Sequence, residues 1–517
     1  MTPPAGSGPR RGKRRRRPLI LLPRRRRGAA QAQERSASLP VSEAVLTSLG
    51  RAVTDRLAEH PDCSGIHPLP NPVNAFSARV LLAEAAERTL DVQYYIWQND
   101  LTGTLLLTAL YDAAERGVRV RLLLDDNGID GLDRTLAAVN AHPNIEVRLF
   151  NPFTLRWPKS LGFLTDFARA NRRMHNKSFT ADNQATIVGG RNIGDEYFGA
   201  GEGGVFADLD ILGVGPVAQD VSTDFDRYWA SASACPLEAI LAPPEFAEPG
   251  LDAAEATLSA TPIARAYLDA VRGSSLVRDL ESGGLAMEWA RTEMLSDDPA
   301  KGLGRAPPEG LLTHRLVGLI EGAQRSFNLI SPYFVPAGRG TGLLGGLVAR
   351  GVATRVLTNA LEATDVALVH AGYMKRRRAL LAAGVRLFEM RRHSPKGDWK
   401  DIAGPFGISG ASLHAKTFSV DGERVFVGSF NFDARSANLN TESGFLIDSP
   451  ELARRIDEAF DTTVAETAYE VRLNGGALQW VEHDGGTPAV YRREPNTGFA
   501  RWLVLRLLSC LPIEALL

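Results

Sequence analysis

The apolar residues of this 517-residue chain gather in short runs, and these runs come in two sets with the same rhythm. In each set, three apolar runs alternate with longer stretches of helical character. The runs lie at 90–97, 118–124 and 147–150 in the first set, and at 327–334, 353–357 and 385–388 in the second. Strands that alternate with helices are typical of layered α/β proteins. We therefore predict an α/β fold made of two similar units.

The two sets share identical short sequences at nearly constant spacing. Val-Arg-Leu-Phe occurs at 147–150 and again at 385–388, an offset of 238 residues. Arg-Gly-Val occurs at 116–118 and at 350–352, an offset of 234 residues. Landmarks that keep both their order and their spacing indicate an internal duplication. The chain is therefore expected to be a fused pair of related lobes.

Changes in composition divide the chain into four predicted segments. A Pro- and Gly-rich region at about 243–308 connects the two repeats, and residues 287–293 within it are predicted to add a strand or a helix. The segments are a disordered Arg-rich leader at 1–40, an N-terminal lobe at 41–255, a C-terminal lobe at 256–470 and a C-terminal extension at 471–517. With 44% hydrophobic residues, both lobes can enclose a core of their own.

Charge is distributed unevenly along the chain. Residues 1–27 hold 11 basic residues and no acidic one, which leaves 48 basic and 60 acidic residues in the rest, a net charge of −12. The basic leader has two interpretations: it binds anionic lipid headgroups, at on the order of 1 kcal/mol per basic residue, or it is a solvated tail. A nucleic-acid-binding protein would need a basic body with stacking aromatic residues, so the acidic body argues against nucleic acid as a partner.

The C-terminal stretch at 498–517 is apolar but interrupted by charge. Arg501, Arg506 and Glu514 punctuate it, and Trp502 lies among its leucines. A Trp/Leu face with Arg opposite suits an interfacial helix in the headgroup layer of a membrane, and a helix docked on the protein's own core is the alternative. No run of eighteen or more uncharged apolar residues occurs, so membrane contact is expected to be peripheral.

The most specific feature is a His-x-Lys-x4-Asp motif that occurs twice, at an offset of 239 residues. The chain has 51 Arg but only 8 Lys, so roughly 0.14 His-x-Lys pairs are expected by chance. Each motif is predicted to open the first strand of a hairpin, at 175–180 and at 414–420, where His and Lys at i and i+2 point the same way. The Asp of each copy is expected in the hairpin turn, which it supports. Gly and Asn follow at equal spacing in both copies. The residues are His175, Lys177, Asp182, Gly189 and Asn192 in the first copy and His414, Lys416, Asp421, Gly428 and Asn431 in the second.

Two imidazoles and two ammonium groups suit group transfer at a phosphodiester. One neutral imidazole attacks phosphorus, and the other, protonated, gives its proton to the leaving alcohol. Lys177, Lys416, Asn192 and Asn431 would hold the nonbridging oxygens, where negative charge grows in the transition state. Protonated lysine cannot ligate a metal, and the three cysteines lack zinc spacing. We therefore predict no metal and no other cofactor.

These paired motifs, with their Gly and Asn followers, resemble those of the phospholipase D superfamily over about residues 75–450. Further stretches resemble bacterial cardiolipin synthases of the C type, although the Arg-rich leader departs from that family. The stretches are LDVQYYIWQND (90–100), RLLLDDNG (121–128), RRMHNKSFT (172–180), GGRNIGDEYF (189–198) and LPIEALL (511–517).

The resemblance implies two phospholipase D-like α/β/α sandwich lobes with mixed sheets, related by a pseudo-twofold axis that brings His175 and His414 face to face. It implies that His175 is the nucleophile and His414 the general acid/base. It also implies that two carboxylates, Asp208 and Glu442, orient the imidazoles.

The activity that the resemblance implies is transfer of a phosphatidyl group, through a phosphohistidine, to phosphatidylglycerol to give cardiolipin. The expected phospholipid substrates are phosphatidylglycerol and, as a second candidate, phosphatidylethanolamine, and the identity of the donor stays open. If water accepts instead, the same site is a phospholipase D that releases phosphatidic acid. A superfamily nuclease and an inactive membrane-binding scaffold are further alternatives, but the acidic body disfavours the first and the intact motifs disfavour the second. The implied location is the cytoplasmic face of the bacterial inner membrane, where the protein would bind an anionic surface peripherally.

Two other polar positions stand out. His370 lies on a predicted helix, where a packed or surface histidine is the default, and the resemblance adds headgroup or acceptor binding as an alternative. Asp125 and Asp126 follow a predicted strand without a cluster of partner ligands. We interpret this acidic pair as structural.

Overall fold

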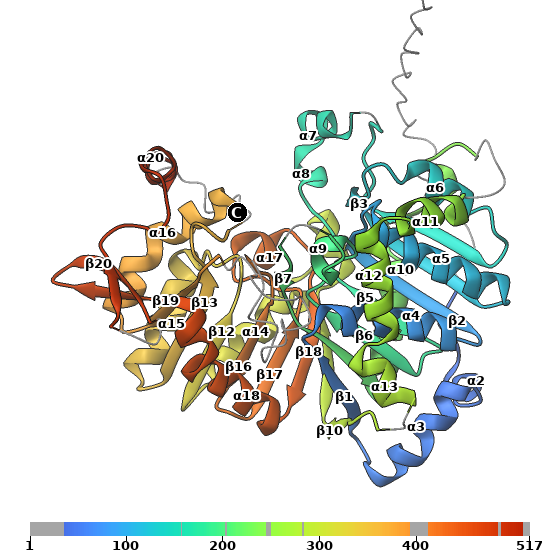
Figure 1. The fold of residues 1–517 in the computed structure, drawn as a ribbon, viewed down its shortest axis with the longest axis horizontal. Coiled ribbons are helices and arrows are strands. Elements are labelled where there is room, and N and C mark those ends of the chain that lie inside the picture. The colour runs from blue at the N-terminus through green and yellow to red at the C-terminus, as the bar shows by residue number, and fades with distance from the viewer. Residues whose placement is uncertain are drawn as a thin grey trace, which may run out of the picture.

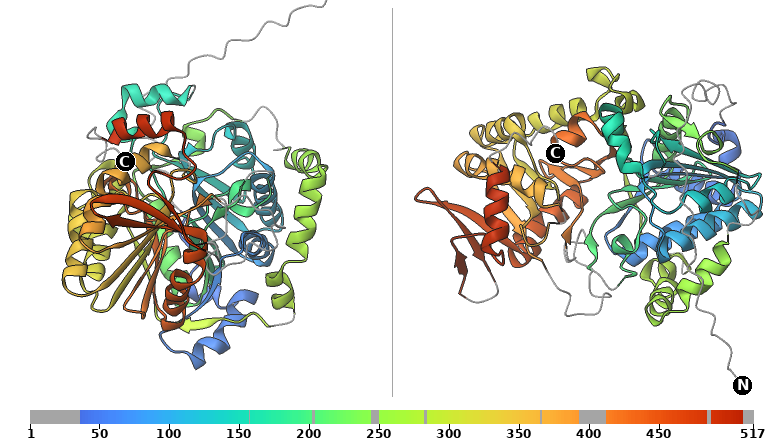
Figure 2. Two further views of the ribbon diagram at one scale, coloured as in Figure 1. Left: turned by 60° about the vertical axis from the view of Figure 1, so that its left-hand side comes forward. Right: turned by 90° about the horizontal axis from the view of Figure 1, so that it is seen from above.

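Two large sheets, each flanked by helices, lie side by side and make up most of the molecule (Figures 1 and 2). The computed structural model describes residues 36–156, 158–201, 204–243, 250–281, 284–364, 366–392, 412–483 and 487–509. Within these ranges, nine strands form the N-terminal sheet and ten form the C-terminal sheet. Both sheets mix parallel and antiparallel pairs, so the predicted α/β class with two related lobes is confirmed.

The N-terminal sheet has the strand order β10-β1-β8-β6-β5-β2-β3-β4-β9. Its strands are β1 (Ser64–Leu69), β2 (Thr89–Ile96), β3 (Arg119–Gly128), β4 (Ile145–Phe150), β5 (Ser178–Ala181), β6 (Ala185–Gly189), β8 (Asp210–Val214), β9 (Ala234–Pro236) and β10 (Glu288–Ala290). The three central strands β2, β3 and β4 are parallel because helices return the chain across the sheet between them. They are buried along most of their length, which explains why their sequences are continuous apolar runs.

Helices and short helical turns surround this sheet. They are α2 (Val41–Ala44), α3 (Ser48–Glu59), α4 (Pro72–Ala85), α5 (Leu101–Glu115), α6 (Asp133–Val139), α7 (Gly162–Thr165), α8 (Phe167–Ala170), α9 (Asp195–Phe198), α10 (Pro216–Trp229), α11 (Leu251–Ser259), α12 (Pro262–Arg272) and α13 (Ser275–Glu281). The crossover helix α5 begins where the Asp100 carboxylate accepts the N–H of Gly103 at 2.9 Å, an N-cap that satisfies a free backbone donor. Its leucines Leu106, Leu107 and Leu110 are buried in the N-terminal core.

The C-terminal sheet repeats this arrangement in the order β11-β18-β17-β16-β12-β13-β14-β19-β20-β21. Its strands are β11 (Thr292–Ser296), β12 (Ser326–Ile330), β13 (Ala353–Asn359), β14 (Arg386–Met390), β16 (Thr417–Val420), β17 (Arg424–Gly428), β18 (Ser443–Asp448), β19 (Ala468–Asn474), β20 (Ala477–Glu482) and β21 (Ala489–Tyr491). Its helices are α14 (Leu312–Glu321), α15 (Ala337–Ala349), α16 (Ala367–Ala382), α17 (Ala434–Asn438), α18 (Pro450–Asp461), α19 (Thr463–Thr467) and α20 (Phe499–Ser509). The parallel strands β12, β13 and β14 correspond to β2, β3 and β4.

The chain passes from one sheet to the other at Arg291. β10 pairs with β1 in the N-terminal sheet, and β11 pairs with β18 in the C-terminal sheet. Helix α11 crosses the expected lobe boundary at residue 255, and α12 and α13, which lie beyond it, contribute Tyr267 and Leu276 to the N-terminal core. β19 to β21 likewise extend the C-terminal sheet past residue 470. The expected extra element at 287–293 is a pair of strands, and the domain limits themselves stay predictions.

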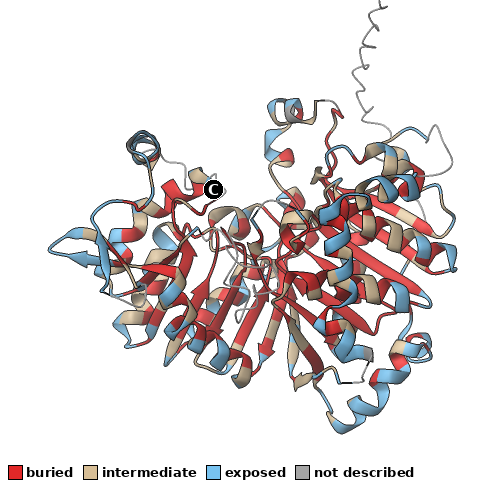
Figure 3. Cartoon of the chain, in the orientation of Figure 1, coloured by how far each residue is buried: buried red, intermediate tan, exposed pale blue. Residues whose placement is uncertain are grey.

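A shared apolar core joins the two lobes. One buried cluster combines Val188 and Ile211 of the N-terminal sheet with Leu357, Val425 and Phe445 of the C-terminal sheet. Figure 3 shows that buried residues run along the central strands of both sheets. Burial of apolar area on this scale stabilises the packed pair of lobes at roughly 25 cal/mol per Å² removed from water. The lobes therefore have little freedom to move apart.

Both predicted motif hairpins are present, but their strands begin later than expected. β5 starts at Ser178 and β16 at Thr417, so the His-x-Lys part of each motif precedes its strand. The predicted strand starts at His175 and His414 are therefore wrong, because the backbone there bonds to the other lobe. In the turns, Asp182, Asn183, Asp421 and Gly422 all have positive φ, the backbone conformation that tight hairpin turns require.

The ends of the chain are described in part. Residues 1–35 of the predicted leader lie outside the described residues, whereas Ser36 and Ser38 bond to the N-terminal lobe through Arg121. At the other end, α20 packs on α16, and the final stretch from residue 510 is not described. No helix in the described ranges has both the length and the apolar character of a membrane span.

Candidate active site

Each His-x-Lys motif lies just before its own strand, at the carboxyl edge of the parallel strands, and its backbone bonds to the opposite lobe. The His175 N–H donates to the Thr441 carbonyl at 2.8 Å, and the His414 N–H donates to the Ala207 carbonyl, also at 2.8 Å. A two-stranded pairing of β7 (Phe206–Ala207) with β15 (Ser412–Leu413) carries the second contact, and a bridge between Met174 and Thr441 carries the first. The exchange is reciprocal, as a pseudo-twofold axis requires.

The residue after Thr441 is Glu442, which holds the imidazole of His175. Its Oε2 lies 2.8 Å from Nδ1 of His175, and the carbonyl of Ser429 lies 3.1 Å from the same nitrogen. Both neighbours of Nδ1 are acceptors, so Nδ1 carries the proton and Nε2 presents a lone pair. The hydroxyls of Ser429 and Ser436 fix the carboxylate, at 2.6 and 2.8 Å. The Tyr95 ring packs edge-on against the imidazole, with 5.0 Å between centroids.

The second imidazole is held in the same manner from the N-terminal lobe. Asp208 follows Ala207, and its Oδ2 lies 2.6 Å from Nδ1 of His414. Its other oxygen accepts the N–H of Leu209 at 2.8 Å. The rings of Tyr197 and Phe206 flank His414, with centroids 5.2 and 5.1 Å away. Each lobe thus supplies one histidine and the carboxylate that holds the other lobe's histidine.

Both motif lysines are buried beside their histidines. The ammonium of Lys177 donates to the carbonyl of His175 at 2.6 Å and lies 5.5 Å from the centre of the Tyr95 ring. Lys416 donates to the carbonyl of His414 and lies 3.1 Å from its Nδ1. An ammonium has three donors, so each lysine can hold its own loop and also donate to an oxyanion. Burial lowers the pKa of Lys177 well below its ordinary value.

The electrostatic environment differs between the two imidazoles. Burial, followed by the ammonium groups of Lys177 and Lys416, lowers the pKa of His175 well below its usual value. Burial and Lys416 also lower the pKa of His414, but the carboxylate of Asp208 opposes this shift. His175 is therefore neutral near pH 7, and His414 has the stronger support for a positive charge.

The pKa shifts of the two carboxylates also differ, and the difference favours a positive charge on His414 over His175. Burial alone would raise the pKa of Asp208, but the imidazole of His414 and the nearby Lys416 lower it well below its usual range. For Glu442, burial dominates and raises the pKa despite the ammonium of Lys177. Asp208 is thus the firmer anion, and the charge that it places beside His414 favours an imidazolium there.

The predicted asparagines lie in the site but have different surroundings. The amide of Asn192 is already bonded, since its oxygen accepts from Ile96 at 3.3 Å and its nitrogen donates to the Tyr197 hydroxyl at 2.9 Å. Asn431 is 4% exposed, and its Oδ1 has no hydrogen-bond partner among the described residues. Amide oxygen and nitrogen are interchangeable by a flip, so this unpartnered end can become a donor to an oxyanion.

The motif aspartates support the hairpin turns, as the sequence predicted. Each carboxylate accepts N–H groups from three consecutive residues at the start of the neighbouring strand. The donors are Glu87, Arg88 and Thr89 to Asp182, and Gln324, Arg325 and Ser326 to Asp421. Neither aspartate bonds to the motif histidines or lysines, so their effect on the site passes through the backbone.

Sequence reasoning assigned Asp125 a structural role but missed its link to the site. Its carboxylate accepts the N–H of Met174 at 2.7 Å and lies 3.1 Å from the guanidinium of Arg173, which fixes the chain directly before His175. Tyr95 was also missed. Both lie near the carboxyl ends of the central parallel strands β2 and β3, where α/β proteins place their sites, and that rule could have found them.

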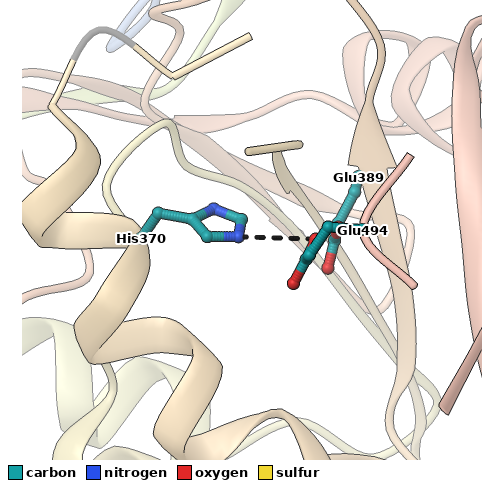
Figure 4. Close-up of side chains that lie close together, drawn as sticks. All are labelled: His370, Glu389 and Glu494. Carbon is teal, nitrogen blue, oxygen red and sulfur yellow. Dashed lines mark ion pairs between the residues drawn. The ribbon is translucent and has the colours of Figure 1, made fainter. Parts of the chain in front are cut away.

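His370 lies in a buried cluster that is separate from the two motifs (Figure 4). Within the described part of the chain, His370, Glu389 and Glu494 form the one group whose ligand atoms lie close enough to hold a metal, within 4.8 Å. The guanidinium of Arg377 already lies among them, at 2.6 Å from Glu494, 2.9 Å from Glu389 and 3.0 Å from Nε2 of His370. A cation is thus in place, and a metal does not fit these residues. His370 is 3% exposed and is a packed histidine.

The comparisons with known proteins agree with this geometry. The family model described as "Cardiolipin synthase, PLD-like domain" matches residues 80–229 and 316–464, one match in each lobe. The solved structure of a phosphatidylserine synthase from Haemophilus influenzae Rd KW20 has the same fold, with a TM-score of 0.56, 13% identity and coverage of 91% of this chain and all of that one.

Curated relatives extend the match to most of the sequence. The chain is 48% identical to cardiolipin synthase C of Escherichia coli K12 over 470 residues, which cover 91% of this chain and 99% of that protein. It is 26% identical to a cardiolipin synthase of Staphylococcus aureus over 76% of this chain and 66% of the relative. With its two motifs joined in one reciprocal site, this chain belongs to the cardiolipin synthase family of phospholipase D-like enzymes.

Proposed function

We propose that this enzyme makes cardiolipin by moving a phosphatidyl group from a donor phospholipid to phosphatidylglycerol. The observation that carries the proposal is the reciprocal site, in which each of two buried imidazoles bonds through Nδ1 to a carboxylate of the other lobe. Both Nε2 atoms are thereby left for chemistry, one as a nucleophile and one as a proton carrier. The 48% identity to a cardiolipin synthase supports the choice of acceptor.

In the first half-reaction, Nε2 of His175 attacks the phosphorus of the donor. A P–N bond forms, the P–O bond to the donor's headgroup alcohol breaks, and Nε2 of His414 gives its proton to the departing oxygen. Neutral His175 and carboxylate-supported His414 suit these roles. The ammonium groups of Lys177 and Lys416, with the amide of Asn431, would hold the nonbridging oxygens.

In the second half-reaction, His414 is the base. It takes the proton of a glycerol hydroxyl on phosphatidylglycerol, the hydroxyl oxygen attacks phosphorus, and the P–N bond to His175 breaks. The products are cardiolipin and an enzyme in its starting protonation state. With phosphatidylglycerol as donor, the released alcohol is glycerol, and with phosphatidylethanolamine it is ethanolamine.

The proposed substrates are phospholipids, so the enzyme is expected to work at a bacterial membrane. We place it peripherally on the cytoplasmic face of the inner membrane, with an anionic lipid surface as its partner. The exposed apolar and basic residues of α20 are consistent with the interfacial role that the sequence predicted for this stretch.

A product assay tests the proposal. The purified full chain would be mixed with vesicles that contain radiolabelled phosphatidylglycerol, and the lipids would be separated after reaction. We expect labelled cardiolipin and glycerol release in equal amounts. Phosphatidic acid as the sole product would instead establish the hydrolytic alternative, and unchanged product from His175→Asn or His414→Asn would contradict the mechanism.

A further inference from the structure

Two apolar projections stand out on the described surface, one from each lobe. The first is the α7–α8 segment, residues 158–171, in which Leu161, Leu164 and Phe167 are 41%, 81% and 52% exposed. Of its aromatic rings, Phe163 packs against Phe153 at 5.2 Å and so ties the segment to the lobe. Val41, Val45 and Leu46 form a third exposed apolar set, at 46%, 37% and 68%, but α2 and its turn lie on the opposite side of Figure 1. Position relative to the site, and not exposure alone, therefore distinguishes the two projections.

The second projection is α20. Leu503, Val504 and Leu507 are 40%, 55% and 63% exposed, whereas Leu505 is buried against Leu361 and Ala371. The helix thus docks by one side and presents the other to its surroundings. The buried ion pair between Glu494 and Arg377 fixes the chain just before the helix. Figure 3 shows α20 as mainly exposed and the α7–α8 segment as a mixture of exposed and partly buried residues.

Topology places both projections on the side of the molecule that carries the histidines. The α7–α8 segment is the connection from the carboxyl end of β4 to His175. α20 packs on α16, which follows the carboxyl end of β13, and the side chain of Asn359 at that strand end bonds the backbone of Leu413, next to His414. Both projections extend from the upper side of the molecule in Figure 1 and in the left view of Figure 2.

Contacts hold the first projection at the junction of the lobes. Arg172, directly after the α7–α8 segment, donates to the Asn438 carbonyl at 2.9 Å, and Arg435 donates to the Asn171 side chain at 2.7 Å. The segment is therefore fixed relative to the C-terminal lobe, from which the second projection extends. Both projections are thereby anchored on the C-terminal lobe, the first through Arg172 and Asn171 and the second through α16.

Their charge is opposite to that of the body. Without its first 27 residues the chain has a net charge of −12, yet Arg501 and Arg506 are exposed on α20 and no acidic residue occurs at 495–509. In and beside the α7–α8 segment, Lys159 and Arg169 pair with Asp126 and Asp166, and Arg172 adds a further positive charge. Apolar tips with basic flanks complement a bilayer that contains anionic phospholipids.

We propose that the α7–α8 segment and α20 together dock the enzyme on a phospholipid bilayer, with both histidines directed at the headgroups. This inference rests on the proposed function for its substrate, and it adds a binding surface that includes a part of the N-terminal lobe. Two insertions into one bilayer bind more tightly than either alone, because the second is an intramolecular event. Substrates then reach the site without leaving the membrane plane.

Vesicle co-sedimentation of the full chain tests this surface. The variants are Leu164→Gln/Phe167→Gln in the α7–α8 segment and Val504→Gln/Leu507→Gln in α20. The matched control is Val41→Gln/Leu46→Gln, where the exposed fractions are 46% and 68% and the side chains belong to α2 and the turn after it, on the opposite side of Figure 1. The vesicles contain phosphatidylglycerol and phosphatidylethanolamine.

Each projection variant is expected to partition about tenfold more weakly than wild type, and the control variant equally well. Turnover of a short-chain, water-soluble phosphatidylglycerol should be unchanged in all three, which shows that they are folded and that catalysis is intact. Binding of the α7–α8 variant at the wild-type level would overturn the proposal. So would a change in oligomeric state on light scattering without lipid, since the surface would then bind a second copy of the chain.

The result separates this inference from the proposed function, because co-sedimentation requires no turnover. Weakened binding of both variants supports the docking surface even if the wild-type product is phosphatidic acid. Wild-type binding of both variants overturns the docking surface even if the product is cardiolipin.

Discussion

The two halves of the active site have the same parts but different electrostatics. His175 with Glu442 and His414 with Asp208 arise from a duplicated motif, and each histidine receives its carboxylate from the other lobe. Yet burial raises the pKa of Glu442, whereas Asp208 stays a firm anion and supports a charge on His414. A symmetric duplication thus acquires a nucleophile and a proton carrier through its neighbours.

The largest expected effect comes from removal of the histidines. His175→Asn should reduce phosphatidyl transfer by about 10⁴-fold or more, because no P–N bond can form. His414→Asn should cost about 10²–10⁴-fold with a natural donor, since a general acid is lost. Both effects are measured as kcat for phosphatidyl transfer, with phosphatidylglycerol and with phosphatidylethanolamine as the donor.

A donor with a good leaving group distinguishes the two roles. A nitrophenyl phosphodiester needs no general acid, so formation of the covalent intermediate should recover in His414→Asn but not in His175→Asn. Recovery in His175→Asn alone would reverse the assignment.

The carboxylates provide the next contrast. Asp208→Asn should lower kcat by about 10²-fold and Glu442→Gln by about tenfold, because an amide can still accept from neutral His175 but cannot balance an imidazolium at His414. Asp208 raises the pKa of His414, so its loss should also move the basic limb of the pH–rate profile to lower pH. An equal decrease of kcat in both variants, with no shift of the basic limb of the pH–rate profile, would show that the two halves are electrostatically alike.

The pH profile of the wild-type enzyme offers a smaller test. His175 must be neutral to attack, and its pKa lies below the ordinary value of about 6.5, so it stays neutral when the pH falls through that value. The acid limb of kcat/KM should therefore lie below pH 6.5. NMR titration of the His175 ring should likewise give a pKa below the ordinary value. An ordinary or raised pKa of His175 would contradict the electrostatic account.

The smallest expected effect concerns the turns. Asp182 is fully buried and bonds three backbone N–H groups, whereas its counterpart Asp421 is part-exposed. Asp182→Asn should lower the free energy of unfolding by about 1–3 kcal/mol, and Asp421→Asn by less, because water can replace some of its bonds. Urea unfolding measures both, with exposed Asp130→Asn as the control. A larger loss at Asp421 would reverse this part of the comparison.

Much of the architecture could be predicted from sequence because it depends on local pattern and repetition. The apolar runs became the parallel strands β2, β3 and β4 and their repeats, and the motif hairpins turn at Asp182 and Asp421. The late start of β5 could not be predicted, since it depends on a hydrogen bond from His175 to Thr441 across the lobes. Sequence spacing carries no information on how two lobes dock.

The same limit applies to the surroundings of the site. Asp208 and Glu442 were found only through the family resemblance, because nothing in their local sequence indicates that each would hold the other lobe's histidine. Nothing in the local sequence of the α7–α8 segment marks its leucines as a binding surface. They became informative once the contact of Arg172 with the other lobe fixed where the segment lies.

The central claim, that the duplicated histidines have separate roles, is tested most directly by location of the covalent intermediate. The enzyme would be mixed with a labelled donor, quenched in base to preserve phosphohistidine, digested and analysed by mass spectrometry. The account predicts the phosphatidyl adduct on the peptide that contains His175, with no adduct in His175→Asn. An adduct on the His414 peptide, or on both peptides equally, would contradict it.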